Sequence, residues 1–110
     1  MISLVIISIK LEIGNLISNN GNIIKGPLII KPRIFKDSRG FFYESWNQKS
    51  FDEYLNNSII FSQDNHSCSD FGVIRGLHYQ IEPKPQGKLV RCTYGEIFDV
   101  AVDIRQKSET

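Results

Sequence analysis

The stretch GVIRGLHYQ, residues 72–80, places two chemically capable side chains, Arg75 and His78, inside an otherwise apolar run. Histidine is the side chain best suited to take or give a proton near neutral pH. Gly76 lies two positions before His78, and the missing side chain there would let a ligand approach the backbone. The bland alternative is an ordinary strand with a hydrogen-bonded structural histidine, and composition alone favours that alternative.

Further polar residues could complete a site around this stretch. Lys88 and Arg91 carry cations that could neutralise an enolate or a phosphate, although cations beside a strand are more often solvated. Gln63, Asp64 and Asn65 form a polar cluster, for which the alternative is a turn whose side chains cap backbone groups. The residue types therefore indicate a polar pocket in an apolar domain without fixing its chemistry.

The ligand count argues against a metal site. The two histidines, His66 and His78, are twelve positions apart, and neither belongs to an HxH pair. Double-stranded β-helix metal sites use such a pair, and Gln80 stands where its second histidine would fall. Cys68 and Cys92 are far apart and form no CxxC motif, so we expect two reduced thiols in a cytoplasmic protein.

Length and composition predict one small globular domain. The chain has 110 residues, of which 41% are apolar and 23% are charged. A formal net charge of +1 gives no electrostatic reason to expect a nucleic acid or a membrane surface as partner. The apolar run at 2–9 is too short to span a bilayer and lacks the basic start of a secretory signal. We interpret residues 1–22 as a leader or an extra strand, and residues 23–110 as the domain.

The elements that must position these residues are mostly short strands. One short helix is predicted near residues 50–56, with Ser50 as its cap and Glu53 completing a capping box. A turn is predicted at 36–40, and a hairpin around Gly95. The pattern indicates an all-β antiparallel sandwich or barrel with too few strands for a closed jelly roll. The predicted strands are 28–30, 41–46, 59–61, 73–80, 88–94 and 96–105.

Four blocks, taken together and in order, resemble the dTDP-4-dehydrorhamnose 3,5-epimerase family. The resemblance implies a cupin-type jelly roll (a double-stranded β-helix), incomplete in this chain, and a cytoplasmic homodimer without metal or organic cofactor. It also implies epimerisation of dTDP-4-dehydro-6-deoxy-D-glucose at carbons 3 and 5, by proton abstraction alpha to the keto group, to dTDP-4-dehydro-L-rhamnose. The blocks are DSRGFFYESWN (37–47), QDNHSCS (63–69), GVIRGLHYQ (72–80) and QGKLVRCTYGEIFDVAVDIR (86–105).

The same resemblance assigns expected roles to individual residues. His78 matches the base, Lys88 the cation near the keto oxygen, and Arg75 a substrate-binding arginine. Because Arg75 and His78 are three apart, a flat strand would place them on opposite faces, so we expect a bulge or twist at Gly76. The remaining matches to substrate-binding positions are Arg39, Glu44, Gln63, Asp64 and Asn65, and Phe41 is expected to pack against the thymidine or the sugar.

The end of the chain departs from the family pattern. In the family, a later part carries a tyrosine that acts as the acid on the opposite face and an acidic residue that orients the histidine. The four tyrosines here, Tyr43, Tyr54, Tyr79 and Tyr94, do not match that position. We therefore expect a fragment with impaired epimerase activity. The alternatives are a degenerate, non-catalytic nucleotide-sugar-binding module, or a related epimerase acting at one carbon or on another nucleotide sugar.

Overall fold

The computed structural model describes residues 12–108. These residues divide into two compact units. The first comprises the described residues up to Ser58 together with those from Val100 onward, and the second is Ile59–Asp99. Each unit is described below by itself. No helix among residues 12–108 has the length and apolar character needed to cross a membrane.

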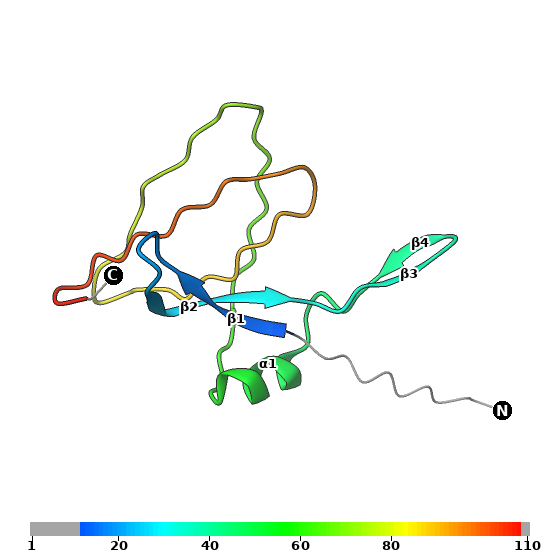
Figure 1. Ribbon diagram of the computed structural model, residues 1–110, viewed down its shortest axis with the longest axis horizontal. Coiled ribbons are helices and arrows are strands. Elements are labelled where there is room, and N and C mark those ends of the chain that lie inside the picture. Colours follow the sequence, from blue (N-terminus) through cyan, green and yellow to red (C-terminus); the bar gives the residue numbers. More distant parts are fainter. Residues whose placement is uncertain (1–11, 109–110) are drawn as a thin grey trace. The chain divides into compact units, whose positions relative to one another are not determined.

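An antiparallel hairpin begins the first unit (Figure 1). It pairs β1 (Glu12–Ile17) with β2 (Ile23–Lys31), so the predicted strand at 28–30 is confirmed as part of a longer strand. The intervening turn closes where Ser18 N donates to Asn22 O at 2.8 Å and Gly21 N donates to Ser18 O at 2.9 Å. β1 lies within the segment 1–22, and residues 1–11 of that segment fall outside the described part of the chain.

A bulge interrupts the β1–β2 ladder. Asn15 is opposite Leu28, whereas the next residue, Leu16, is opposite Ile24. Three residues of β2, 25–27, therefore have no partner in β1. Proline lacks the N–H that a ladder needs and glycine accepts positive φ, so the Gly26-Pro27 pair suits this interruption, with φ of +116° at Gly26.

The bulge decides which apolar side chains of the hairpin are covered. In a regular ladder, residues three apart on one strand face opposite sides of the sheet. The shifted register nevertheless gives cover both to the pair Ile13 and Ile30 and to the pair Leu16 and Ile24. Ile24 is the most covered of these, with 8% of its surface exposed.

A second, shorter hairpin follows. It pairs β3 (Phe35–Asp37) with β4 (Gly40–Phe42) through the turn predicted at 36–40. Asp37 Oδ1 accepts from Arg39 N at 2.8 Å, and Gly40 has a φ of +134°. The aromatic strand predicted over 41–46 is wrong in its length, since β4 ends at Phe42.

The single helix of the described residues is α1 (Gln48–Leu55), close to the predicted position (Figure 1). The prediction of Ser50 as its cap is wrong: Asn47 is the N-cap, and its Oδ1 accepts from Ser50 N at 3.1 Å. Asn47 has the extended backbone of an N-cap, whereas Ser50 is already helical. Phe51 is buried on the inner face of the helix, with its ring centroid 4.9 Å from that of Trp46.

No strand is assigned between residues 59 and 108. The strands predicted at 59–61, 73–80, 88–94 and 96–105, and the hairpin around Gly95, are therefore wrong for this structure. High β propensity produces a ladder only where a second segment pairs with the backbone groups. Here these segments run as extended chain, and apolar side chains such as Ile74 are 90% exposed. The regular structure that does form is predominantly β, with one short helix.

Candidate active site

The second unit contains the predicted base. The imidazole of His78 turns back toward Gly76: a Cβ placed at Gly76 would lie 3.5 Å from Nδ1 and 3.8 Å from Cε1 of His78. Gly76 has a φ of +121°, which residues with a side chain rarely adopt. The backbone thus departs from a regular strand at the residue where the sequence predicts a bulge or twist.

Arg75 has partners on its N-terminal side. Its Nε donates to the hydroxyl of Ser69 at 2.9 Å, and its Nη2 donates to the carbonyl oxygen of Cys68 at 3.4 Å. The guanidinium therefore connects the block 63–69 to the block 72–80. Within the second unit, no hydrogen bond joins Arg75, His78 and Lys88 to one another, so their expected convergence on one substrate stays a prediction.

Lys88 is held by Gln80. Its Nζ donates to Gln80 Oε1 at 2.9 Å, and the same oxygen accepts from Gln86 N at 3.0 Å. The amide nitrogen of Gln80 donates in turn to Gln86 Oε1 at 3.2 Å. The predicted cation of the site is thereby tied to the end of the stretch that carries His78.

The cluster at 63–65 contains a pairing between two side chains, whereas the turn interpretation expects side chains that cap backbone groups. Gln63 Nε2 donates to Asn65 Oδ1 at 3.2 Å, and all three side chains are exposed. Exposed amides remain available to a ligand because exchanging one hydrogen-bond partner for another costs little in water. Their assignment to substrate binding stays a prediction.

In the first unit, Arg39 forms a close ion pair with Asp37. Arg39 Nη2 lies 2.5 Å from Asp37 Oδ2, and Arg39 Nε donates to the same oxygen at 3.1 Å. The hydrogen bonds from Arg39, first from its side chain and then from its backbone, lower the pKa of Asp37. Those to Asp37 raise the pKa of the Arg39 guanidinium. Arg39 is 88% and Asp37 50% exposed, so solvent screens the pair and a second anion can compete for the guanidinium.

Glu44 and Phe41 also have local partners. Asn47 Nδ2 donates to Glu44 Oε1 at 2.9 Å, so the N-cap of α1 also orients the predicted binding carboxylate. The ring of Phe41 stacks on Tyr43, with centroids 6.0 Å apart and an interplanar angle of 21°. Phe41 is exposed and Tyr43 is half-buried, so Phe41 offers a flat face of the kind that bases and sugars stack on.

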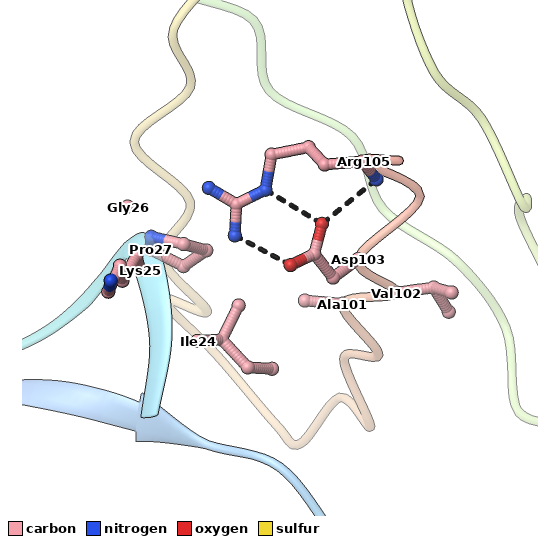
Figure 2. A pocket seen from close by; sticks show the side chains of 8 residues that line it. All are labelled: Ile24, Lys25, Gly26, Pro27, Ala101, Val102, Asp103 and Arg105. Carbon is pink, nitrogen blue, oxygen red and sulfur yellow. Dashed lines mark hydrogen bonds and ion pairs between the residues drawn. The ribbon is translucent and has the colours of Figure 1, made fainter. Parts of the chain in front are cut away.

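A separate hollow of about 300 Å³ lies within the first unit (Figure 2). The bulge of β2 forms one wall, and residues 101–105 form the other. Asp103 is almost fully covered and accepts two bonds from the Arg105 guanidinium, at 2.8 and 2.6 Å, and one from the Ser108 hydroxyl at 2.6 Å. This pairing raises the pKa of Arg105. None of the predicted site residues lines the hollow.

Sequence reasoning missed the side chains that hold the candidate residues. These are Asp37 for Arg39, Asn47 for Glu44, Ser69 for Arg75, and Gln80 for Lys88. Only Asp37 had a recognisable signal, because an Asp in a turn often accepts from the backbone two residues on. Residues 12–108 contain no cluster of three or more metal-ligating side chains, and Cys68 and Cys92 are free and exposed.

Comparison with known proteins gives one family. The family model for dTDP-4-dehydrorhamnose 3,5-epimerase matches residues 22–110. Over 83 residues the chain is 63% identical to the dTDP-4-dehydrorhamnose 3,5-epimerase of Shigella flexneri, covering 76% of this chain and 46% of that protein. It is 57% identical over 83 residues to the Salmonella typhimurium protein of the same name, covering 76% of this chain and 45% of that protein.

The similarity extends beyond bacteria. The Methanothermobacter thermautotrophicus protein of the same name is 53% identical over 87 residues, covering 79% of this chain and 46% of that protein. The chain belongs to the dTDP-4-dehydrorhamnose 3,5-epimerase family. It spans about half the length of the curated relatives it matches, and no solved structure matches it.

Proposed function

We propose that this chain supplies the base-bearing part of an enzyme that epimerises dTDP-4-dehydro-6-deoxy-D-glucose at carbons 3 and 5. The observation that carries the proposal is the family match over residues 22–110, which includes all four sequence blocks and every candidate residue. The product is dTDP-4-dehydro-L-rhamnose. The exposed backbone at Gly76, which lies beside the His78 imidazole, supports a site at which a sugar ring approaches the base.

The chemistry needs a base, an oxyanion stabiliser and an acid. Both reacting carbons are alpha to the 4-keto group, so the carbonyl acidifies each C–H bond. His78 removes the proton, the electron pair moves into an enolate, and a proton returns on the opposite face of the carbon. Lys88 stabilises the developing negative charge on the keto oxygen through its ammonium group.

The remaining candidates bind the nucleotide sugar. Arg75 and Arg39 present guanidinium groups suited to hydroxyl and phosphate oxygens. The Arg39 guanidinium is paired with Asp37, so phosphate binding exchanges one anion for another. The other members of the binding set are Glu44, Gln63, Asp64 and Asn65.

The wider properties of the enzyme belong to the same proposal. We assign the complete protein a cupin-type jelly roll, a homodimeric assembly, a cytoplasmic location, and a reaction that uses neither a metal nor an organic cofactor. We assign residues 23–110 to the N-terminal part of the epimerase domain, and residues 1–22 to a leader or an extra strand. The exposed apolar side chains between residues 71 and 104 support further sheet partners for these segments, because a strand pattern this apolar is normally covered.

A proton-exchange experiment tests the proposal. The 110-residue chain is incubated with dTDP-4-dehydro-6-deoxy-D-glucose in deuterated water, and deuterium at carbons 3 and 5 is followed by NMR. Base-dependent exchange without efficient formation of the L-rhamno product is expected, since none of the four tyrosines matches the acid of the family. Rapid conversion to the L-rhamno product would disprove the impairment. Exchange at one carbon alone would instead indicate a single-site epimerase.

The second candidate function is nucleotide-sugar binding without turnover. The observation that favours it is that, within the described second unit, no hydrogen bond joins Arg75, His78 and Lys88 to one another. Calorimetric titration with dTDP, together with the exchange experiment, separates the two functions. Binding of dTDP with no exchange at either carbon would identify a binding module, and exchange abolished by His78→Asn would identify the enzyme.

A further inference from the structure

We propose that Gln80 is a positioning residue that holds the ammonium of Lys88 and closes the loop 81–87; this rests on the proposed function, in which Lys88 stabilises the enolate. Three hydrogen bonds converge on this one amide. Gln80 lies two residues after His78, and Lys88 lies eight residues after Gln80. We call these three hydrogen bonds the Gln80 clamp. The clamp links His78 and Lys88 through a short piece of backbone, residues 78–80, and the side chain of Gln80.

The donors around the amide fix its orientation. The ammonium of Lys88 and the backbone N–H of Gln86 can only donate, so the oxygen of Gln80 must face both. The amide nitrogen of Gln80 is then directed to the remaining acceptor, Gln86 Oε1. A reversed amide would place N–H groups against two donors and lose all three bonds. The hydrogen-bond partners within the chain therefore fix the orientation of the Gln80 amide.

The clamp acts on a segment that is already restricted. The loop between Gln80 and Lys88 contains Pro83 and Pro85, whose rings limit the unfolded conformations of the loop. A turn bond from Lys84 N to Ile81 O at 3.4 Å shortens the same loop. The loop therefore loses little conformational entropy when it closes, and three hydrogen bonds can offset that loss even though each of them is exposed to solvent.

The position of the Lys88 ammonium matters because stabilisation of the enolate depends on the distance between this cation and the keto oxygen. A displacement of about 1 Å away from a reacting centre can lower a rate about a hundredfold. Without the Gln80 oxygen, the four-carbon stem of Lys88 samples many rotamers and the ammonium leaves its place for most of the time. Substrate binding by the other candidate residues would change much less.

The first test measures directly whether Gln80 restrains the Lys88 ammonium, and it does not require enzyme activity. The 110-residue chain is labelled with a limiting amine-reactive acetylating reagent, and the rate at each lysine is measured by mass spectrometry. Gln80→Ala should raise the labelling rate of Lys88 about two- to tenfold, the factor that corresponds to one hydrogen bond. Gln80→Glu keeps an acceptor oxygen for Lys88 and should leave Lys88 protected. Gln106→Ala, an exposed glutamine in the C-terminal turn, is the matched control, and Lys49 in α1, outside the loop, is the internal reference.

An unchanged labelling rate of Lys88 in Gln80→Ala would overturn the proposal that Gln80 holds Lys88. An equal rise at Lys49 and Lys88 would also overturn the proposal, since that result indicates a general loss of structure.

The second test reads the consequence for the reaction. At saturating substrate, Gln80→Ala should lower the deuterium-exchange rate at least about tenfold while KM changes less than about threefold. A rise in KM with an unchanged maximal rate would overturn the positioning role. Failure of the proposed function looks different, because exchange would then be absent, or would survive both His78→Asn and Lys88→Met. If the unaltered chain shows no exchange, the labelling result alone decides whether Gln80 holds Lys88.

Discussion

The imidazole of His78 and the backbone of Gly76 form one geometric unit. A Cβ at position 76 would be 3.5 Å from Nδ1 and 3.6 Å from the backbone nitrogen of His78, which are ordinary contact distances. Space is therefore available there. The restriction at Gly76 comes from its φ of +121°, which an L residue with a side chain rarely adopts.

Gly76→Ala should consequently move the His78 ring through the backbone. We expect a local cost of about 1–3 kcal/mol for holding a non-glycine residue in this conformation. The ring resonances of His78 should shift in the NMR spectrum, and the deuterium-exchange rate should fall. Gly87→Ala is the control, because position 87 has no neighbouring atom within 4 Å and no positive φ in the restricted range. Equal effects of the two substitutions would contradict this account of Gly76.

His78→Asn should abolish exchange at both carbons. The expected loss is about 10²- to 10⁴-fold, the usual contribution of a positioned general base. His66→Asn should retain exchange, since His66 lies outside the stretch 72–80 that carries the proposed base. The measurement is deuterium incorporation at each carbon with matched protein concentrations. Exchange that persists in His78→Asn but disappears in His66→Asn would transfer the role of base to His66.

Lys88→Met should lower exchange at both carbons while dTDP binding is largely retained. Methionine keeps an unbranched stem but removes the charge that stabilises the enolate oxygen, a loss of about 10²- to 10³-fold for a single stabilising group. Exchange kinetics and calorimetric titration with dTDP measure the two effects separately. A loss of dTDP affinity with unchanged exchange would assign Lys88 to nucleotide binding.

The turn between β3 and β4 should depend on pH through Asp37. The Arg39 bonds lower the folded-state pKa of Asp37 below its value in the unfolded chain, about 3.9. The pairing therefore stabilises the turn fully above pH 4 or so, and the stabilisation is lost as the pH falls through the lowered pKa. An NMR titration of the Asp37 carboxyl carbon should show a midpoint below that of an unpaired Asp. Arg39→Gln should move the midpoint up, whereas Arg33→Gln should leave it unchanged.

The cap of α1 distinguishes the structure from the sequence prediction. Asn47→Ala should destabilise the helix by about 1 kcal/mol, because the Ser50 N–H loses its acceptor and Glu44 loses its donor. Ser50→Ala should change the stability by less than about 0.5 kcal/mol, because Ser50 contributes its backbone N–H to the cap. Circular dichroism during chemical denaturation measures both. The reverse order of effects would restore Ser50 as the cap.

Local chemistry made part of this structure predictable from the sequence. The Asp37 and Gly40 turn and the helix with Phe51 inward follow from interactions within a few residues. The exact cap did not, because Asn47 and Ser50 are both good capping residues and the apolar spacing fits either start. The strands predicted beyond residue 59 were wrong. An alternation of apolar and polar residues indicates a preference for two faces, but it cannot supply a segment that pairs with the backbone.

The candidate site was predictable in its residue types more than in its contacts. A departure from extended backbone at Gly76 was expected because Arg75 and His78 are three apart, and Gly76 has a φ of +121°, although residues 73–80 form no strand that could bulge. The Gln80 clamp could not be anticipated. A contact between an amide and an ammonium eight residues apart leaves no periodic pattern in the sequence, and residues 80–88 resemble any other polar loop. Such contacts depend on loop closure, which the proline spacing restricts but does not specify.

The thin core of the described first unit has a calorimetric consequence. Ile24 in β2 and Phe51 in α1 are the apolar side chains of residues 12–108 that are buried, and they belong to different elements. The heat-capacity increment of unfolding comes mainly from apolar surface that becomes hydrated. With so little surface to hydrate, the polypeptide should melt over a wide temperature interval with a shallow heat-absorption peak, and cooling should weaken it less than a domain with a full core.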